Sequence, residues 1–111
     1  NKDEDSNLGN LQFVSVQLPK TTTTTAGITA SVSVSGPNLC YSFKEFQVTT
    51  SEQKVYNIYA KGNVPGPNDI CAQAIYRKDT TLHVATPAPG KYVLNFQNPN
   101  GLFRSDTVQV N

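Results

Sequence analysis

The imidazole and thiol groups that most readily act as a base and a nucleophile are few in this chain of 111 residues: there is one His, His83, and there are two Cys, Cys40 and Cys71. A hydrolase needs a nucleophile, a base and an orienting acid that converge in space. His83 stands between Leu82 and Val84, so on a strand it points away from the face of these apolar neighbours. We therefore predict that the protein is not an enzyme and uses no cofactor. The alternative, a small thiol-based enzyme or redox protein, requires free, accessible thiols near His83.

The acidic residues do not form a metal site in the sequence. Calcium binds clusters of oxygen ligands at short spacing. Outside residues 3–5 the only close pair of such ligands is Asn68-Asp69, and two ligands are too few. Zinc would need Cys and His together. We predict no bound metal.

The two cysteines are better explained by each other. An even number of Cys in a small, strand-rich chain is typical of an exported protein with a disulfide. A bridge between Cys40 and Cys71 closes a loop of about 30 residues, which stabilises the fold by roughly 3 to 4 kcal/mol through the lost entropy of the unfolded chain. A pair of unbridged thiols in the core is the alternative.

Alternating apolar and polar residues, interrupted by Gly and Pro about every ten positions, predict short strands rather than helices. The longest expected loop, Lys61–Asp69, holds two Gly and two Pro. The pattern predicts an all-β fold, an antiparallel β-sandwich of 7–8 strands of the immunoglobulin-like or fibronectin-like class. The expected strands are Leu11–Leu18, Ile28–Ser35, Leu39–Val48, Val55–Ala60, Ile70–Tyr76, Thr80–Ala85, Lys91–Phe96 and Phe103–Val110.

The segment Pro89-Gly90-Lys91-Tyr92-Val93-Leu94 resembles the tyrosine corner of immunoglobulin-like domains. With the turn Asn98-Pro99-Asn100-Gly101, it is similar to the C-terminal third of bacterial immunoglobulin-like modules. This resemblance implies that the Tyr92 hydroxyl bonds back to the backbone of the preceding loop. The chain departs from antibody domains because it contains no Trp, and because Cys40 and Cys71 fall on the third and fifth expected strands.

Residues 1–10 are polar and acidic and show no periodicity, so we predict a flexible tether before a single domain at residues 11–111. The chain contains no Met, and we expect that an upstream segment was removed. The start Lys2-Asp3-Glu4-Asp5 resembles a mature Bacteroidetes surface lipoprotein just after its acylated cysteine. That resemblance implies an extracytoplasmic protein, held at the outer membrane or cell surface by a lipid outside this chain. A solvated leader without such a role is the alternative.

The net charge of +1 gives no case for nucleic-acid binding, and no run of 18 apolar residues is present to span a membrane. Two surfaces are candidates for contact with a partner, since Tyr combines a flat apolar ring with a polar tip and long loops often carry recognition. We predict an exported interaction or structural domain that binds a protein or glycan; a carbohydrate-binding accessory module is the alternative. The candidate residues are Tyr59 and Tyr76 on strands, and Asn63, Asn68 and Asp69 in the long loop.

Overall fold

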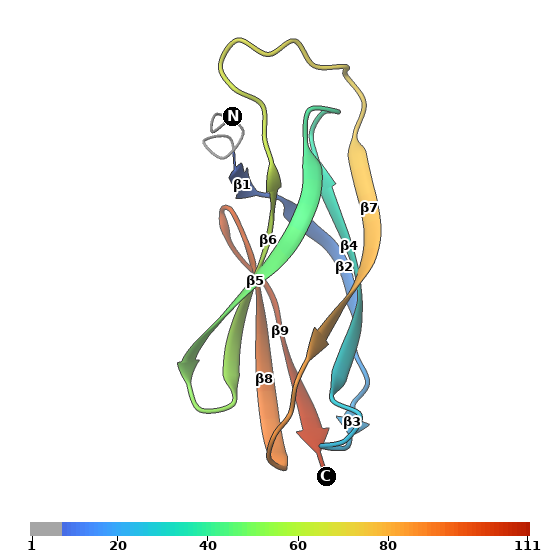
Figure 1. Cartoon of the computed structure of the whole chain (residues 1–111), viewed down its shortest axis with the longest axis vertical. Helices are drawn as coiled ribbons and strands as arrows, with labels where there is room; N and C mark the ends of the chain where they lie inside the picture. The colour runs from blue at the N-terminus through green and yellow to red at the C-terminus, as the bar shows by residue number, and fades with distance from the viewer. Residues whose placement is uncertain (1–7) are drawn as a thin grey trace.

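The computed structural model describes residues 8–111, which form two β-sheets and no helix (Figure 1). The predicted all-β sandwich is confirmed, with seven strands of six residues or more and two short ones. None of these residues belongs to a helix that could cross a membrane. The strands are β1 (Leu8–Asn10), β2 (Gln12–Gln17), β3 (Thr21–Thr22), β4 (Ile28–Gly36), β5 (Ser42–Glu52), β6 (Val55–Asn63), β7 (Tyr76–Val84), β8 (Gly90–Asn98) and β9 (Gly101–Val110).

The larger sheet, sheet A, contains β5, β6, β8 and β9 with the short β1 and β3 added, and sheet B contains β2, β4 and β7. After the β5–β6 hairpin the chain crosses to sheet B for β7 and returns to sheet A for β8. As a result β8 runs in the same direction as β6 and pairs with it in parallel, from Val55 opposite Val93 to Tyr59 opposite Gln97. The short β3 also pairs in parallel, with β9. The sandwich thus combines antiparallel hairpins with two parallel pairs.

The core lies between the sheets and follows the alternation of the sequence. In β4 every second residue from Ile28 to Val34 is buried, and in β8 the buried positions are Tyr92, Leu94 and Phe96. Phe13 of β2 packs edge-on against Phe96, with 5.4 Å between the ring centroids. Because side chains alternate between the faces of a strand, the intervening polar residues lie on the outer faces.

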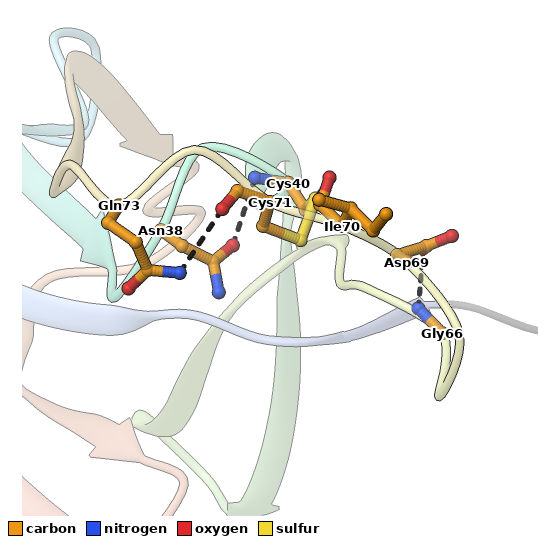
Figure 2. Close-up of a disulfide and its surroundings, with 7 residues drawn as sticks. All are labelled: Asn38, Cys40, Gly66, Asp69, Ile70, Cys71 and Gln73. Atoms are coloured by element: carbon orange, nitrogen blue, oxygen red, sulfur yellow. Dashed lines mark hydrogen bonds between the residues drawn. A yellow bond between two sulfur atoms is a disulfide. The ribbon is translucent and has the colours of Figure 1, made fainter.

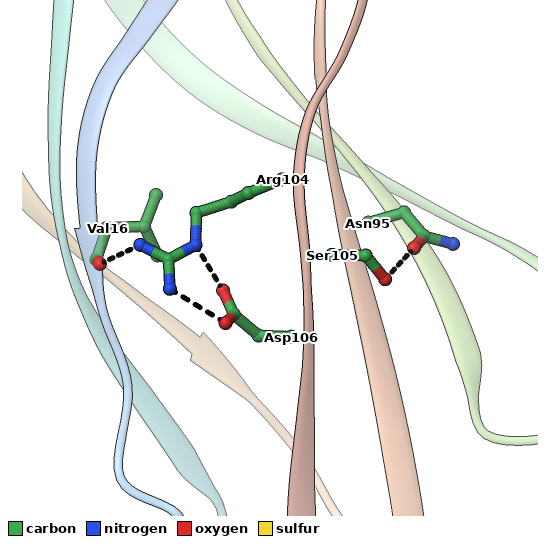
Figure 3. Close-up of polar contacts among 5 residues, drawn as sticks. All are labelled: Val16, Asn95, Arg104, Ser105 and Asp106. Atoms are coloured by element: carbon green, nitrogen blue, oxygen red, sulfur yellow. Dashed lines mark hydrogen bonds and ion pairs between the residues drawn. The ribbon is translucent and has the colours of Figure 1, made fainter.

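One side of the sandwich is closed by a polar contact between the sheets. Arg104 of β9 donates from Nη1 to the backbone oxygen of Val16 in β2, at 3.1 Å. Its guanidinium also pairs with Asp106, with 2.7 Å between Nε and Oδ2, as Figure 3 shows. Arg104 therefore links sheet A to the β2 edge of sheet B.

One of the predicted strands is wrong, and another begins earlier than predicted. The segment Ile70–Tyr76 is not a strand but part of a connection at residues 64–75, and the strand predicted at Thr80–Ala85 begins earlier, as β7 at Tyr76. The alternation in residues 70–76 serves no buried face, since Ile70 is 99% exposed. The charged residues Arg77 to Asp79, which separated the two predicted strands, instead pair with Ser35 to Ser33 of β4. An edge strand tolerates such residues because backbone pairing does not depend on burial.

Two boundaries also change. Residues 8–10 of the predicted tether form β1, which pairs with Asn63 to Lys61 of β6, while residues 1–7 lie outside the described part of the chain. The strand predicted at Leu39–Val48 is β5 and runs from Ser42 to Glu52. Its start moves because Leu39 and Cys40 lie in the turn that the cystine holds. Neither Cys is on a strand, contrary to the prediction.

Candidate functional site

The predicted disulfide is present between Cys40 and Cys71 at one end of the sandwich (Figure 2). Cys40 lies between β4 and β5, and Cys71 lies in the connection from β6 to β7. The backbone N–H of Leu39 also donates to the carbonyl of Ala72, at 3.1 Å. The bridge therefore fixes residues 64–75 to the turn before β5. It joins two connections, whereas the prediction placed it between two strands.

The bridge leaves no free thiol. His83 is exposed on β7, and its Nδ1 lies 3.1 Å from the Thr29 hydroxyl oxygen. The thiol chemistry that formed one alternative would need a free Cys near this imidazole. Among residues 8–111, no three His, Cys, Asp or Glu side chains come together in a way that could hold a metal ion.

Of the three contact residues predicted in the long loop, Asn63 is instead the last residue of β6, so that prediction is wrong, whereas Asn68 and Asp69 lie in the connection that holds Cys71. Asp69 accepts a hydrogen bond from the backbone N–H of Gly66 at 2.7 Å and closes a turn. Asn63 donates to the Ser42 hydroxyl at 2.9 Å. Asn68 is exposed. This end also exposes three large apolar side chains that the sequence analysis did not single out: Leu39, Ile70 and Ile75.

The two tyrosines predicted to form a binding surface occupy different places. Tyr76 is half-buried against the core, and its hydroxyl accepts the backbone N–H of Phe43 at 2.8 Å, which links the start of β7 to β5. Tyr92, predicted as the tyrosine corner, is 1% exposed. Its hydroxyl donates to the Ala88 carbonyl at 2.6 Å, the contact that a tyrosine corner requires. Tyr76 and Tyr92 both hold the fold together.

Tyr59 lies on the outer face of sheet A. It alternates with the buried Ile58 along β6, so its ring points away from the core. The register places Gln47 of β5 and Gln97 of β8 directly opposite it on either side. The ammonium of Lys61, on the same face, lies 6.0 Å from the ring centroid. Tyr59 is thus a half-buried ring among amide side chains.

A chain of hydrogen bonds crosses this face next to Tyr59. The Ser105 hydroxyl donates to Asn95 Oδ1 at 2.6 Å, on the side of β9 away from Arg104 (Figure 3). Asn95 Nδ2 in turn lies 3.4 Å from Asn57 Oδ1, and Gln97 Nε2 lies 3.4 Å from the same oxygen. We call the central part of this outer face the amide face, and Glu45 and Lys61 lie opposite each other at its margin. The amide face consists of Gln47, Thr49, Asn57, Tyr59, Asn95, Gln97 and Ser105.

Sequence reasoning found Tyr59 but missed the rest of the amide face. A signal was present, because Asn95 and Gln97 occupy the polar positions between the apolar residues of β8. The amide groups of both residues lie next to Asn57, which is 38 residues away from Asn95 in the sequence. Only the parallel pairing of β6 with β8 brings these residues together.

The residues from Ala30 to Val110, which run from β4 to β9, match the model of the ORF11 beta-sandwich domain family. The chain belongs to this family. The part of this ORF11 β-sandwich that matches holds most of β4 and all of β5 to β9, with the disulfide and the amide face, whereas β1, β2 and β3 precede it. Comparison with curated proteins gives no match, and comparison with solved structures gives none.

Proposed function

We propose that this ORF11 β-sandwich is an exported, non-enzymatic interaction domain that is tethered at the outside of the cell by a lipid on a cysteine upstream of the chain. The cystine supports export, because disulfides persist in oxidising compartments and are rare in the cytosol. The acidic N-terminus supports the tether through its resemblance to surface lipoproteins. The prediction is that the mass of the protein isolated from its native cells includes a diacylglyceryl group and fatty acid. A mass that corresponds to unmodified polypeptide would reject the lipid tether.

The observation that carries the proposal is the composition of the amide face. None of its seven residues is charged, whereas about 25–35% of the residues on a well-behaved protein surface are Lys, Arg, Glu or Asp. Amide and hydroxyl groups offer donors and acceptors together, so they suit a ligand that presents both. The face is also ordered before any ligand binds, since Ser105, Asn95 and Asn57 restrain each other. Side chains that are already ordered lose less entropy on binding.

A neutral glycan is the second candidate for the partner, and Tyr59 favours it. A pyranose ring presents C–H groups on its faces and hydroxyls around its rim. The Tyr59 ring offers a flat apolar surface against which the C–H groups can pack. Gln47, Gln97 and Asn57 lie around the ring, where they can form hydrogen bonds with the hydroxyls. The same geometry suits a hydroxyl-rich sugar better than an anionic ligand, because the face holds no positive charge apart from Lys61 at its margin.

The test uses affinity electrophoresis in gels that contain one soluble neutral polysaccharide each: xylan, mannan, β-glucan or dextran. We expect retardation in at least one gel, and we expect Tyr59→Ala to weaken binding at least about tenfold, which corresponds to about 1.4 kcal/mol. The matched control is Thr81→Ala, an exposed residue on the strand β7 of the other sheet, which should bind as the wild type does. Equal retardation of Tyr59→Ala and wild type would rule out the amide face as the glycan site. Lack of retardation by all four polysaccharides would reject the glycan proposal in favour of a protein partner.

A further inference from the structure

Strand β5 has an open edge. It is the longest strand, with 11 residues, and among residues 8–111 it pairs only with β6. From Gln47 to Glu52 every residue is exposed, and Val48 is 39% exposed. The hairpin of β5 and β6 diverges from the body of the sandwich in Figure 1. A row of backbone N–H and C=O groups along β5 therefore faces solvent.

The other sheet protects its edges, and β5 does not. In β7 the exposed positions include Arg77, Lys78 and Asp79, and charged residues discourage pairing with a second strand. In β2 a bulge interrupts the ladder between Phe13 and Ser15. The middle of β5, from Phe46 to Thr50, contains no charged residue, no Pro and no Gly. Its two bulges lie only at the ends of this stretch, at Lys44 and Ser51.

We propose that β5 pairs antiparallel with β5 of a second copy of this chain, about a two-fold axis at Val48. In this register Val48 lies opposite its own copy, and Phe46 lies opposite Thr50. The charges at the two ends then match, because Lys44 of each copy lies opposite Glu52 of the other. No pair of like charges is directly opposed, an arrangement that would be unfavourable.

The charge pattern favours a second copy over an unrelated strand as the occupant of this edge. An isologous interface needs a surface that is complementary to itself, and this strand has a cation at one end, an anion at the other and a neutral middle. The pairing would join two copies of sheet A into one continuous sheet. The outer faces of the two copies of sheet A then lie on the same side of the joined sheet, so two amide faces could bind one extended ligand. This last consequence depends on the proposed function, whereas the pairing does not.

The dimer should be weak. One pair of strands buries less surface than the roughly 1,200 Å² of a stable interface. We expect a dissociation constant between about 1 µM and 1 mM, where each tenfold step corresponds to about 1.4 kcal/mol. Sedimentation velocity of the full chain over this range should show a concentration-dependent shift from monomer to dimer. A single monomeric species up to about 1 mM would overturn the proposal.

Cysteine scanning tests the register. Directly opposed residues of an antiparallel pair have Cα atoms about 4.5 to 5.5 Å apart, within the range of a disulfide. Val48→Cys places two thiols on the axis and should give a covalent dimer under mild oxidation. Thr50→Cys is the matched control on the same strand, because its two copies would be four residues apart along the strands, about 13 Å. Cross-linking at position 50 as fast as at position 48 would overturn the proposed register.

Charge reversal tests the end pairs without a new thiol. Lys44→Glu places Glu opposite Glu52 at both ends and should weaken dimerisation at least about tenfold, whereas Lys44→Glu combined with Glu52→Lys should restore it. Both residues are exposed, so circular dichroism should show the same strand content in each variant. A double variant that dimerises no better than the single one would contradict the pairing of these residues. Because glycan retardation is measured separately, failure of the dimer leaves the amide-face proposal intact, and the reverse also holds.

Discussion

Removal of one oxygen atom, by Tyr92→Phe, tests whether the tyrosine corner stabilises the fold. The Tyr92 hydroxyl donates to the Ala88 carbonyl at 2.6 Å, and the Ala88 N–H lies 3.4 Å from the same oxygen. The ring itself stays, with 6.0 Å between its centroid and that of Tyr56. The variant therefore removes a hydrogen bond from a residue that is 1% exposed and creates almost no cavity. The expected loss is about 1 kcal/mol of unfolding free energy, the usual net value of one such bond.

This loss is measurable by thermal and urea unfolding followed by circular dichroism. With an unfolding entropy of about 2.1 cal/mol/K per residue, a loss of about 1 kcal/mol lowers the melting temperature by about 4 °C. The urea midpoint should fall while the slope of the transition stays the same, because the surface exposed on unfolding does not change.

Tyr56→Phe is the control for Tyr92→Phe. Tyr56 is the stacking neighbour of Tyr92, and its hydroxyl makes no hydrogen bond with residues 8–111. Its unfolding free energy should change by less than about 0.5 kcal/mol, as for most changes without a named mechanism. Equal stability of Tyr92→Phe and wild type would refute the corner, and so would equal losses in the two variants.

Two further variants test the connections at the disulfide end. Replacement of both Cys40 and Cys71 by Ser opens a loop with a sequence separation of 31 residues. The free energy of urea unfolding should therefore fall by about 3 to 4 kcal/mol. A loss under about 1 kcal/mol would show that the bridge restrains the unfolded chain little. Gly62→Ala should destabilise by about 2 to 3 kcal/mol in the same assay, because the added Cβ would meet the backbone oxygen of Ser42 where Phe43 of β5 pairs with Gly62 of β6. The control Asn68→Ala, on an exposed side chain, should remain within about 0.5 kcal/mol of wild type, and a Gly62→Ala variant as stable as this control would show that the two strands can move apart.

The alternating pattern correctly predicts the inward-facing residues of strands that have a buried face. In β4 and β8 the apolar residues predicted to point inward are buried, from Ile28 to Val34 and from Tyr92 to Phe96. The closing hairpin was also predictable, because the turn at Pro99-Asn100 brings Asn98 opposite Gly101. These features depend on residues close together in the chain.

The wrong predictions concern two segments whose conformation depends on a part of the chain that is distant in sequence. Residues 70–76 alternate as a strand does, yet Ile70 faces solvent because the cystine at Cys71 ties this segment to the turn before β5. Arg77 to Asp79 read as a break, yet they continue β7 because β4 pairs with their backbone. In both cases a distant segment decides the outcome.

The sequence alone predicted a β-sandwich, the side chains that face inward on strands such as β4 and β8, a disulfide between Cys40 and Cys71, and, through a resemblance, the corner at Tyr92. Such properties follow from the two-residue period of strands and from local turn chemistry. Tertiary structure alone decided that β6 lies parallel to β8, that Tyr59 is flanked by amides from two other strands, and that β5 is left with an open edge. The physical reason is that an alternating pattern specifies a face to bury but carries no information about which strand lies alongside.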